Sequence, residues 1–133
     1  VENMLGMFEF SRFNGDISNW NVSNVTTMEF MFRSSDFNQD ISKWDMSKVT
    51  NMRYMFWHCE SFNQNISQWD VSNVWNMDWM FDGCKSFNQD ISKWDVSNVT
   101  SMKSMFRSTP FNQDISKWKI SHKCNTENIA NMH

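Results

Sequence analysis

The sequence is short of the residues that interrupt ordinary globular chains, since its 133 residues include only three Gly and one Pro. It contains no run of about 20 apolar residues, which excludes a predicted membrane-spanning helix. The first residue, Val1, opens no signal peptide, so we expect an excised or mature soluble piece. A formal net charge of -3 provides no basic footprint for nucleic acid or anionic lipid. These absences leave a protein or a glycan as the expected partner, with no nucleic acid and no direct membrane insertion.

The abundant residues are Phe, Trp and Met, at twelve, eight and twelve copies, which is unusual for a single domain of this length. The dipeptide Phe-Asn recurs at intervals of 24, 25, 25 and 24 residues, starting at Phe13, Phe37, Phe62, Phe87 and Phe111. Self-similarity at a fixed period of this size is typical of repeat architectures. We predict a single domain of about five repeats over residues 1–121, followed by a C-terminal cap or tail over 122–133.

Each repeat predicts one short strand and one short helix. The Ile-x-x-Trp-x-Val stretch contains an alternation that suits a strand, and Ser23, Asn24 or Thr26 can cap a helix that follows, as can Ser72 and Asn73. One such unit cannot bury its apolar side alone, so neighbouring units are expected to stack. The predicted fold class is an α/β repeat solenoid, a right-handed leucine-rich-repeat-like coil with helices on the convex side and parallel strands on the concave side.

The segment VWNMDWMF (74–81) predicts a helix whose Val, Met, Met and Phe share one face and whose two Trp lie on the other. The apolar face recurs unchanged in the other repeats, whereas the outer residues differ from repeat to repeat. We therefore predict a constant buried face and a variable exposed one. The outer residues predicted to contact a ligand are Glu29, Phe30, Arg33, Arg53, Tyr54, Trp57, Trp75, Asp78, Trp79, Asp82, Lys103 and Arg107.

The types of outer residue favour binding, because aromatic side chains and arginine are concentrated in protein interfaces. Large exposed aromatic patches are also rare on soluble monomers. The alternative is structural: the same aromatics cover seams between neighbouring units of a spacer or stalk. A third interpretation is an engineered or rapidly diversified library of binders built on this repeat.

Other residue patterns have a chemical and a plain structural interpretation. Cys59 and Cys84 occupy the same repeat position, so either a disulfide or two small buried residues fit there. A zinc site with His58 lacks a fourth ligand. The repeated Asp of D-I-S suits a calcium ladder or, more simply, an Asx turn onto the amide two residues later. The repeated Asn of F-N-Q is expected to bond backbone groups of adjacent repeats.

The repeats WDVSNVTSMKSMF and FNQDISKW resemble those of the mycoplasma-type domain of unknown function and of BspA-family leucine-rich-repeat surface proteins. The resemblance covers residues 1–121 and implies a cell-surface or extracellular adhesion role, without naming a ligand. It supplies no catalytic residues, and the sequence itself offers no nucleophile, base and orienting group at a plausible spacing. We expect no enzyme activity, no cofactor and no resident metal.

Overall fold

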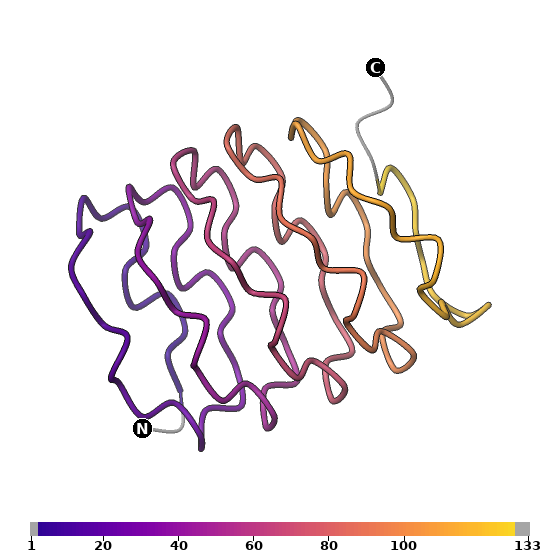
Figure 1. Cartoon of the computed structure of the whole chain (residues 1–133), viewed down its shortest axis with the longest axis horizontal. Helices are drawn as coiled ribbons and strands as arrows, with labels where there is room; N and C mark the ends of the chain where they lie inside the picture. The colour runs from indigo at the N-terminus through magenta and orange to yellow at the C-terminus, as the bar shows by residue number, and fades with distance from the viewer. Residues whose placement is uncertain (1–2, 130–133) are drawn as a thin grey trace.

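The computed structural model describes residues 3–129, which form a stack of coils running from one terminus to the other (Figure 1). We number the coils in chain order: coil 1 is 3–26, coil 2 is 27–50, coil 3 is 51–75, coil 4 is 76–100 and coil 5 is 101–124. Residues 125–129 begin coil 6. Isolated parallel bridges join the first residues of successive coils, at Asn3, Thr27, Asn51, Asn76, Ser101 and Asn125.

Residues 3–129 contain no helix, and their only β pairing is by isolated bridges. The predicted α/β solenoid, with a helix and a strand in each repeat, is therefore wrong. The predicted leucine-rich-repeat-like arrangement, with helices on the convex side and strands on the concave side, is wrong for the same reason.

Tight turns replace the predicted helix. We call the first nine residues of each coil the turn segment, which in coil 2 is 27–35. Three overlapping β-turns in that segment are closed by N–H donation from Met31 to Met28, from Arg33 to Phe30, and from Ser35 to Phe32, at 3.1–3.2 Å. The third residue of the first and last of these turns has a positive φ, 60° at Phe30 and 54° at Ser34. Type II turns require that sign of φ at this residue, whereas a right-handed helix excludes it.

The remaining amides of the turn segment donate to the next coil. In coil 2 the four N–H groups at Met28, Phe30, Phe32 and Ser34 reach carbonyls of coil 3, at N···O distances of 2.7–3.2 Å. Donation within the coil and donation between coils thus alternate along the chain. Buried backbone groups need partners, and this alternation supplies them without a helix.

The first residue of the turn segment caps the third. Asn51 Oδ1 accepts the N–H of Arg53 at 3.0 Å, and Asn76 Oδ1 accepts that of Asp78 at 2.8 Å. The predicted helix caps at Ser23, Asn24, Thr26, Ser72 and Asn73 are wrong, because there is no helix for them to cap. Asn73, for example, donates its side-chain amide to the carbonyl of Ser47 at 2.6 Å.

The predicted strand is also built from turns. In coil 2, Trp44 N–H donates to Ile41 at 3.2 Å and Val49 N–H to Met46 at 3.0 Å. Asp40 Oδ1 accepts the N–H of Ser42 at 2.9 Å, and the same bond recurs in other coils. The predicted Asx turn at D-I-S is confirmed.

The core lies between the turn segments and the opposite side of each coil. The Val, Met, Met and Phe predicted to face inward are completely buried, as at Val49, Met52, Met55 and Phe56. The phenylalanine rings of successive coils stack on one another, as Phe32 and Phe56 do at a centroid distance of 5.5 Å. The predicted inner face is confirmed, although turns rather than a helix direct it inward.

Polar side chains also bond between coils. Asn38 Oδ1 accepts the N–H of Asn63 at 3.0 Å and the side-chain amide of Gln64 at 2.9 Å. The role predicted for the F-N-Q asparagines, bonding backbone groups of adjacent coils, is confirmed at Asn38, Asn63 and Asn88. Asn112, for which the same role is predicted, contributes its backbone N–H to Asn88. Asn14, in the F-N-G of coil 1, also bonds the next coil in this way.

The predicted C-terminal segment continues the coil pattern as far as the structure describes it. Asn125, Glu127 and Ile129 accept backbone N–H groups of coil 5 at 2.7–2.8 Å. Residues 125–129 therefore cover the turn segment of coil 5. The remainder of the predicted cap, 130–133, lies outside the described residues.

Candidate functional site: an aromatic and charged face

The turn segments place most of the predicted ligand-contacting residues in columns that run along the stack. The third residues of the segments include Glu29, Arg53, Asp78 and Lys103. The fourth residues include Phe30, Tyr54 and Trp79, which we call the aromatic column. The seventh residues, which we call the seventh-residue column, are Glu9, Arg33, Trp57, Asp82 and Arg107.

The aromatic column is a stack of nearly parallel rings. Phe30 and Tyr54 have centroids 4.9 Å apart at an interplanar angle of 14°, and Tyr54 and Trp79 are 5.8 Å apart at 2°. Each of the three residues has φ of 60°. The left-handed region costs an L-residue about 1–2 kcal/mol, and coil 1 has glycine, Gly6, at this position. The aromatic side chains are thus held where a glycine would be easier to accommodate.

Guanidinium groups flank these rings. Arg33 Cζ lies 4.7 Å from the centroid of Phe30, Arg53 Cζ lies 5.4 Å from that of Tyr54, and Arg107 Cζ lies 5.1 Å from that of Trp79. A cation over an aromatic face is attracted by the quadrupole of the ring. The ring faces are therefore occupied by other rings or by arginine.

The seventh-residue column is linked from end to end. Arg33 pairs with Glu9 at 2.6 Å and lies 6.0 Å from the ring centroid of Trp57. The indole N–H of Trp57 donates to Asp82 at 3.1 Å, and Asp82 pairs with Arg107 at 3.1 Å. The Asp82 side chain is 1% exposed, so its carboxylate holds these neighbours in place and is not presented at the surface.

The third residues pair in a similar way. Arg53 and Glu29 form an ion pair at 2.9 Å. Asp78 Oδ1 accepts the backbone N–H of Lys103 at 2.7 Å and the hydroxyl of Ser101. The predicted site residues therefore satisfy one another between coils to a large extent.

One predicted ligand-contacting residue, Trp75, lies outside the aromatic column and the seventh-residue column. Trp75 is the last residue of coil 3, where coils 2 and 4 have Thr50 and Thr100, and its backbone bonds those two residues at 2.8–2.9 Å. It is 47% exposed and makes no ring contact with the described residues. Trp79 is only partly exposed. The two indoles predicted to share a helix face thus have different surroundings.

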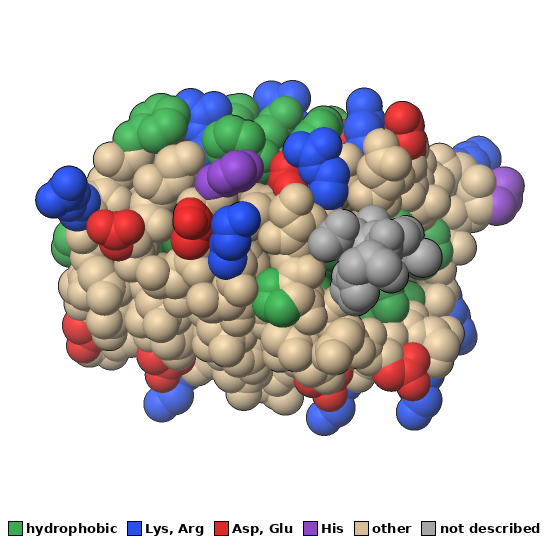
Figure 2. Space-filling view, turned by 90° about the horizontal axis from the view of Figure 1, so that it is seen from above, with side chains coloured by type: hydrophobic (Ala, Val, Ile, Leu, Met, Phe, Trp, Pro, Cys, Tyr) green, Lys and Arg blue, Asp and Glu red, His purple; other side chains and the backbone are tan. Residues whose placement is uncertain are grey.

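The sequence interpretation missed residues of coil 1 and a histidine. Phe10 is 64% exposed, and Arg33 Cζ lies 4.6 Å from its ring centroid. Glu9 neutralises the same arginine, and His58 lies against Trp57 at 4.0 Å. Aligning VENMLGMFEF position by position with the later repeats would have placed Glu9 and Phe10 in this face. Figure 2 shows hydrophobic side chains gathered along one border of the molecule with Lys and Arg among them.

The cysteines are thiols. Cys59 and Cys84 are buried and free, and Cys84 Sγ donates to the carbonyl of Phe56 at 2.8 Å. Burial raises the pKa of the Cys59 thiol to about 11 and raises that of Cys84 as well. The described residues include no group of three or more His, Cys, Asp or Glu side chains placed to hold a metal ion.

Comparison with known families agrees with the repeat pattern. The chain belongs to a mycoplasma family of unknown function. The matching family model, described as "Mycoplasma protein of unknown function, DUF285", covers residues 1–74 and 34–133. Neither a curated protein nor a solved structure matches the chain. Within residues 3–129 there is no helix with the length and apolarity that crossing a membrane requires.

Proposed function

We propose that this family member is an extracellular, surface-displayed recognition module that binds a protein through the aromatic column and the arginines beside it. The observation that carries the proposal is the backbone at Phe30, Tyr54 and Trp79, where aromatic side chains occupy a left-handed conformation. Three large rings at such positions are retained at a backbone cost, which supports a role beyond forming the coil. The proposal includes no catalytic function and no cofactor.

The orientation of the rings favours a protein partner over a glycan. Sugars stack on open aromatic faces, but here rings and guanidinium groups already cover the faces. What remains accessible is ring edge and arginine. Aromatic and arginine side chains are enriched at the centres of protein interfaces. The resemblance to BspA-family surface proteins, with their adhesion role, agrees with this choice.

The test is a binding screen of the immobilised chain against extracellular proteins and, in parallel, a glycan array. The site variant is Phe30→Ser, Tyr54→Ser and Trp79→Ser together, because Ser104 occupies the same position at φ 54°. The control is Trp75→Ser, which removes an exposed indole outside the aromatic column. We expect the site variant to lose at least tenfold in affinity for a captured protein and the control to keep it. Equal capture by both variants, or capture of glycans only, would contradict the proposal.

A second candidate is a structural spacer. It is favoured by the ion pairs Glu9–Arg33, Glu29–Arg53 and Asp82–Arg107, which join variable residues of successive coils. In a spacer these pairs and the aromatic column serve only to hold the coils in register. That role predicts a large fall in melting temperature for the triple Ser variant and no protein captured by the unmodified chain.

A further inference from the structure

The third, fourth and seventh residues of the turn segments form one surface, which we call the candidate face, and its acidic groups are buried more deeply than its basic ones. In the ion pair of Arg53 and Glu29, the arginine side chain is 41% exposed and the glutamate 16%. Asp82, the acid of a second pair, is 1% exposed, whereas Arg33 and Glu9 are even at 27% each. The ionic groups that this face presents to a partner are therefore mainly cationic.

Asp78 and Lys103 differ in the same direction. Asp78 Oδ1 accepts the backbone N–H of Lys103 and the hydroxyl of Ser101, so this acid is satisfied by groups of coil 5. The ammonium group of Lys103, by contrast, has no ion-pair or hydrogen-bond partner among residues 3–129. Lys103 is partly exposed. One cation of the candidate face thus has no described counter-charge in contact with it.

Arg53 keeps a donor available although it is already paired. Its Nε and Nη2 both bond Glu29 Oε2 at 2.9 Å, and Nη1 has no partner among the described residues. A guanidinium carries N–H donors on more than one edge, in a planar fork that fits a carboxylate. Its Cζ lies 5.5 Å from the ring centroid of Phe30 and 5.4 Å from that of Tyr54. These rings hold the group in position, so binding a second carboxylate costs little side-chain entropy.

The charges of the candidate face balance, which argues against a polyanion as the partner. Its third and seventh residues in coils 1–5 include four cations and four anions, namely Arg33, Arg53, Lys103, Arg107, Glu9, Glu29, Asp78 and Asp82. Nucleic acids and other polyanions are attracted by an excess of positive charge and by the release of counterions. Single carboxylates beside apolar groups fit better, because Arg53 lies against the ring of Tyr54.

We propose that the partner binds the candidate face through an acidic segment of polypeptide, in which Asp or Glu side chains are interspersed with apolar ones. This inference rests on the proposed function and adds the chemistry of the protein partner. One partner carboxylate binds Arg53 and another binds Lys103. The apolar side chains of the segment cover the ring edges of Tyr54 and Trp79. The buried acids of the face do not repel such a segment, because their own cations and backbone donors neutralise them.

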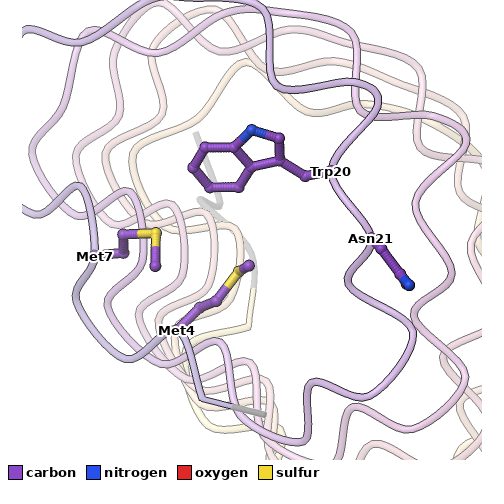
Figure 3. A pocket seen from close by; sticks show the side chains of 4 residues that line it. All are labelled: Met4, Met7, Trp20 and Asn21. Carbon is purple, nitrogen blue, oxygen red and sulfur yellow. The ribbon is translucent and has the colours of Figure 1, made fainter. Parts of the chain in front are cut away.

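The apolar cavity of the molecule differs in chemistry from the candidate face. It has a volume of about 310 Å³ and is lined by Met4, Met7, Trp20 and Asn21 (Figure 3). No charged side chain of the described residues lines it, so nothing in it selects an acidic segment. Met7→Lys, which places a charge there, is therefore expected to leave the binding of such a segment unchanged.

The test uses a random-peptide library displayed on phage and selected on the immobilised chain. The site variant is Arg53→Gln with Lys103→Gln. Arg107 stays, because its loss would leave the buried carboxylate of Asp82 without its cation. We expect the selected peptides to be enriched in Asp and Glu and to bind the site variant about tenfold more weakly. Amide replacements of the peptide acids should cause the same loss on the unmodified chain and no further loss on the site variant.

The control variant is Lys43→Gln with Lys93→Gln, which makes the same change in charge at exposed positions outside the turn segments. We expect it to keep full affinity for the selected peptides. Circular dichroism melts of each variant check that it is folded. A second arm offers heparin and vesicles of equal parts phosphatidylserine and phosphatidylcholine. Capture of either one that the site variant loses would assign these cations to a polyanion or a membrane and overturn the proposal.

The triple Ser variant of the aromatic column separates this inference from the proposed function. Peptides that are weakened by the triple Ser variant but not by the site variant would overturn the acidic segment and leave the aromatic column as the binding surface. Peptides that bind all variants equally would overturn both. The acidic segment is also rejected if no peptide is selected, if the selected peptides are not enriched in acids, or if Met7→Lys or the lysine control weakens them as much as the site variant does.

Discussion

At the scale of single residues, the fourth and eighth positions of the turn segments have positive φ throughout the stack. These positions hold Gly6 and Gly83 but also residues as large as Phe10 and Trp79. Left-handed backbone is costly for any residue with a Cβ, and the hydrogen bonds to the neighbouring coil hold it in place. The backbone conformation is therefore a property of the stack and not of the side chain.

Gly83 provides a direct check of this view. Its φ is 77°, and a Cβ added there would lie 2.8 Å from His58 Cδ2. Gly83→Ala is expected to lower the free energy of unfolding by about 1–3 kcal/mol, measured by urea denaturation. The control is Ser108→Gly at the same position of coil 5, with φ 59°, which should stay within about 0.5 kcal/mol of the unmodified chain or exceed it. A tolerated alanine at 83 would mean that the backbone there is not left-handed.

The cysteines differ in their access to reagents. Burial raises the thiol pKa of all three, but Cys59 and Cys84 are buried, whereas Cys124 is only partly buried. Thiolates are the reactive form, so alkylation at neutral pH should modify Cys124 first and the other two only after unfolding. Mass spectrometry of the labelled chain counts the modified thiols. A chain that resists full labelling in denaturant until it is reduced would contradict the assignment of three free thiols.

At the scale of local elements, the tryptophans hold one coil to the next. Ile17 O closes a turn by accepting Trp20 N–H and also accepts the indole N–H of Trp44, each at 3.1 Å. Both lone pairs of one carbonyl are thus used, which couples the turn in coil 1 to the packing of coil 2.

Trp44→Phe keeps an aromatic ring but removes this donor. We expect it to cost about 1–2 kcal/mol of unfolding free energy, from the lost hydrogen bond and the smaller ring. Trp20→Phe is the matched change at the stack end, where no indole acceptor exists among the described residues, and should cost about 0.5 kcal/mol or less in the monomer. Chemical denaturation at low protein concentration compares the two variants. An equal loss of unfolding free energy in both would contradict the proposed role of the indole hydrogen bond in coupling the coils.

The Asx turns provide a pH-dependent contribution. Hydrogen bonds from Ser side chains and backbone amides lower the pKa of Asp16 and Asp40 below the ordinary value of 3.8, and the same two kinds of bond lower those of Asp90 and Asp114. A carboxyl whose pKa is lower in the folded state stabilises the fold fully above the unfolded pKa. That contribution disappears as the pH falls through the folded pKa. The chain should therefore lose stability as the pH falls below about 4.

Asn65 shows how to test this, because it replaces the aspartate in coil 3 and accepts the N–H of Ser67 at 2.9 Å. Changing Asp16, Asp40, Asp90 and Asp114 to Asn should keep the turns and flatten the decline of the melting temperature between about pH 6 and pH 2.5. Melting curves that fall in parallel for both chains would show that these carboxyls do not cause the acid dependence.

The secondary structure of the turn segments was the least predictable feature of the fold from sequence. Apolar residues spaced at three and four, as in Val49, Met52, Met55 and Phe56, suit a helix, and consecutive β-turns also place them on one side. Glycine inside two of these segments, at Gly6 and Gly83, was the available signal against a helix. The backbone of these segments is decided by hydrogen bonds to residues 23 or 24 positions away, which a local pattern does not contain.

At the scale of the whole molecule, the repeat interval predicts which residues meet. Glu29 and Arg53 occupy the same position of successive repeats and form an ion pair, as do Asp82 and Arg107. The buried face was predictable because burial depends on the side of the chain and not on the kind of turn. The different surroundings of Trp75 and Trp79 were not predictable in this way. The two residues are four positions apart, and only a helix would have placed them together.

The aromatic column and its arginines owe their positions to the hydrogen bonds between turn segments. Scalar coupling across hydrogen bonds, measured by NMR on labelled protein, identifies each donor and acceptor directly. We expect a coupling from the amide nitrogen of Tyr54 to the carbonyl carbon of Asp78, whose oxygen is 3.0 Å from that nitrogen. A coupling from Tyr54 to the carbonyl of Thr50, four residues earlier as in an α-helix, would contradict the account.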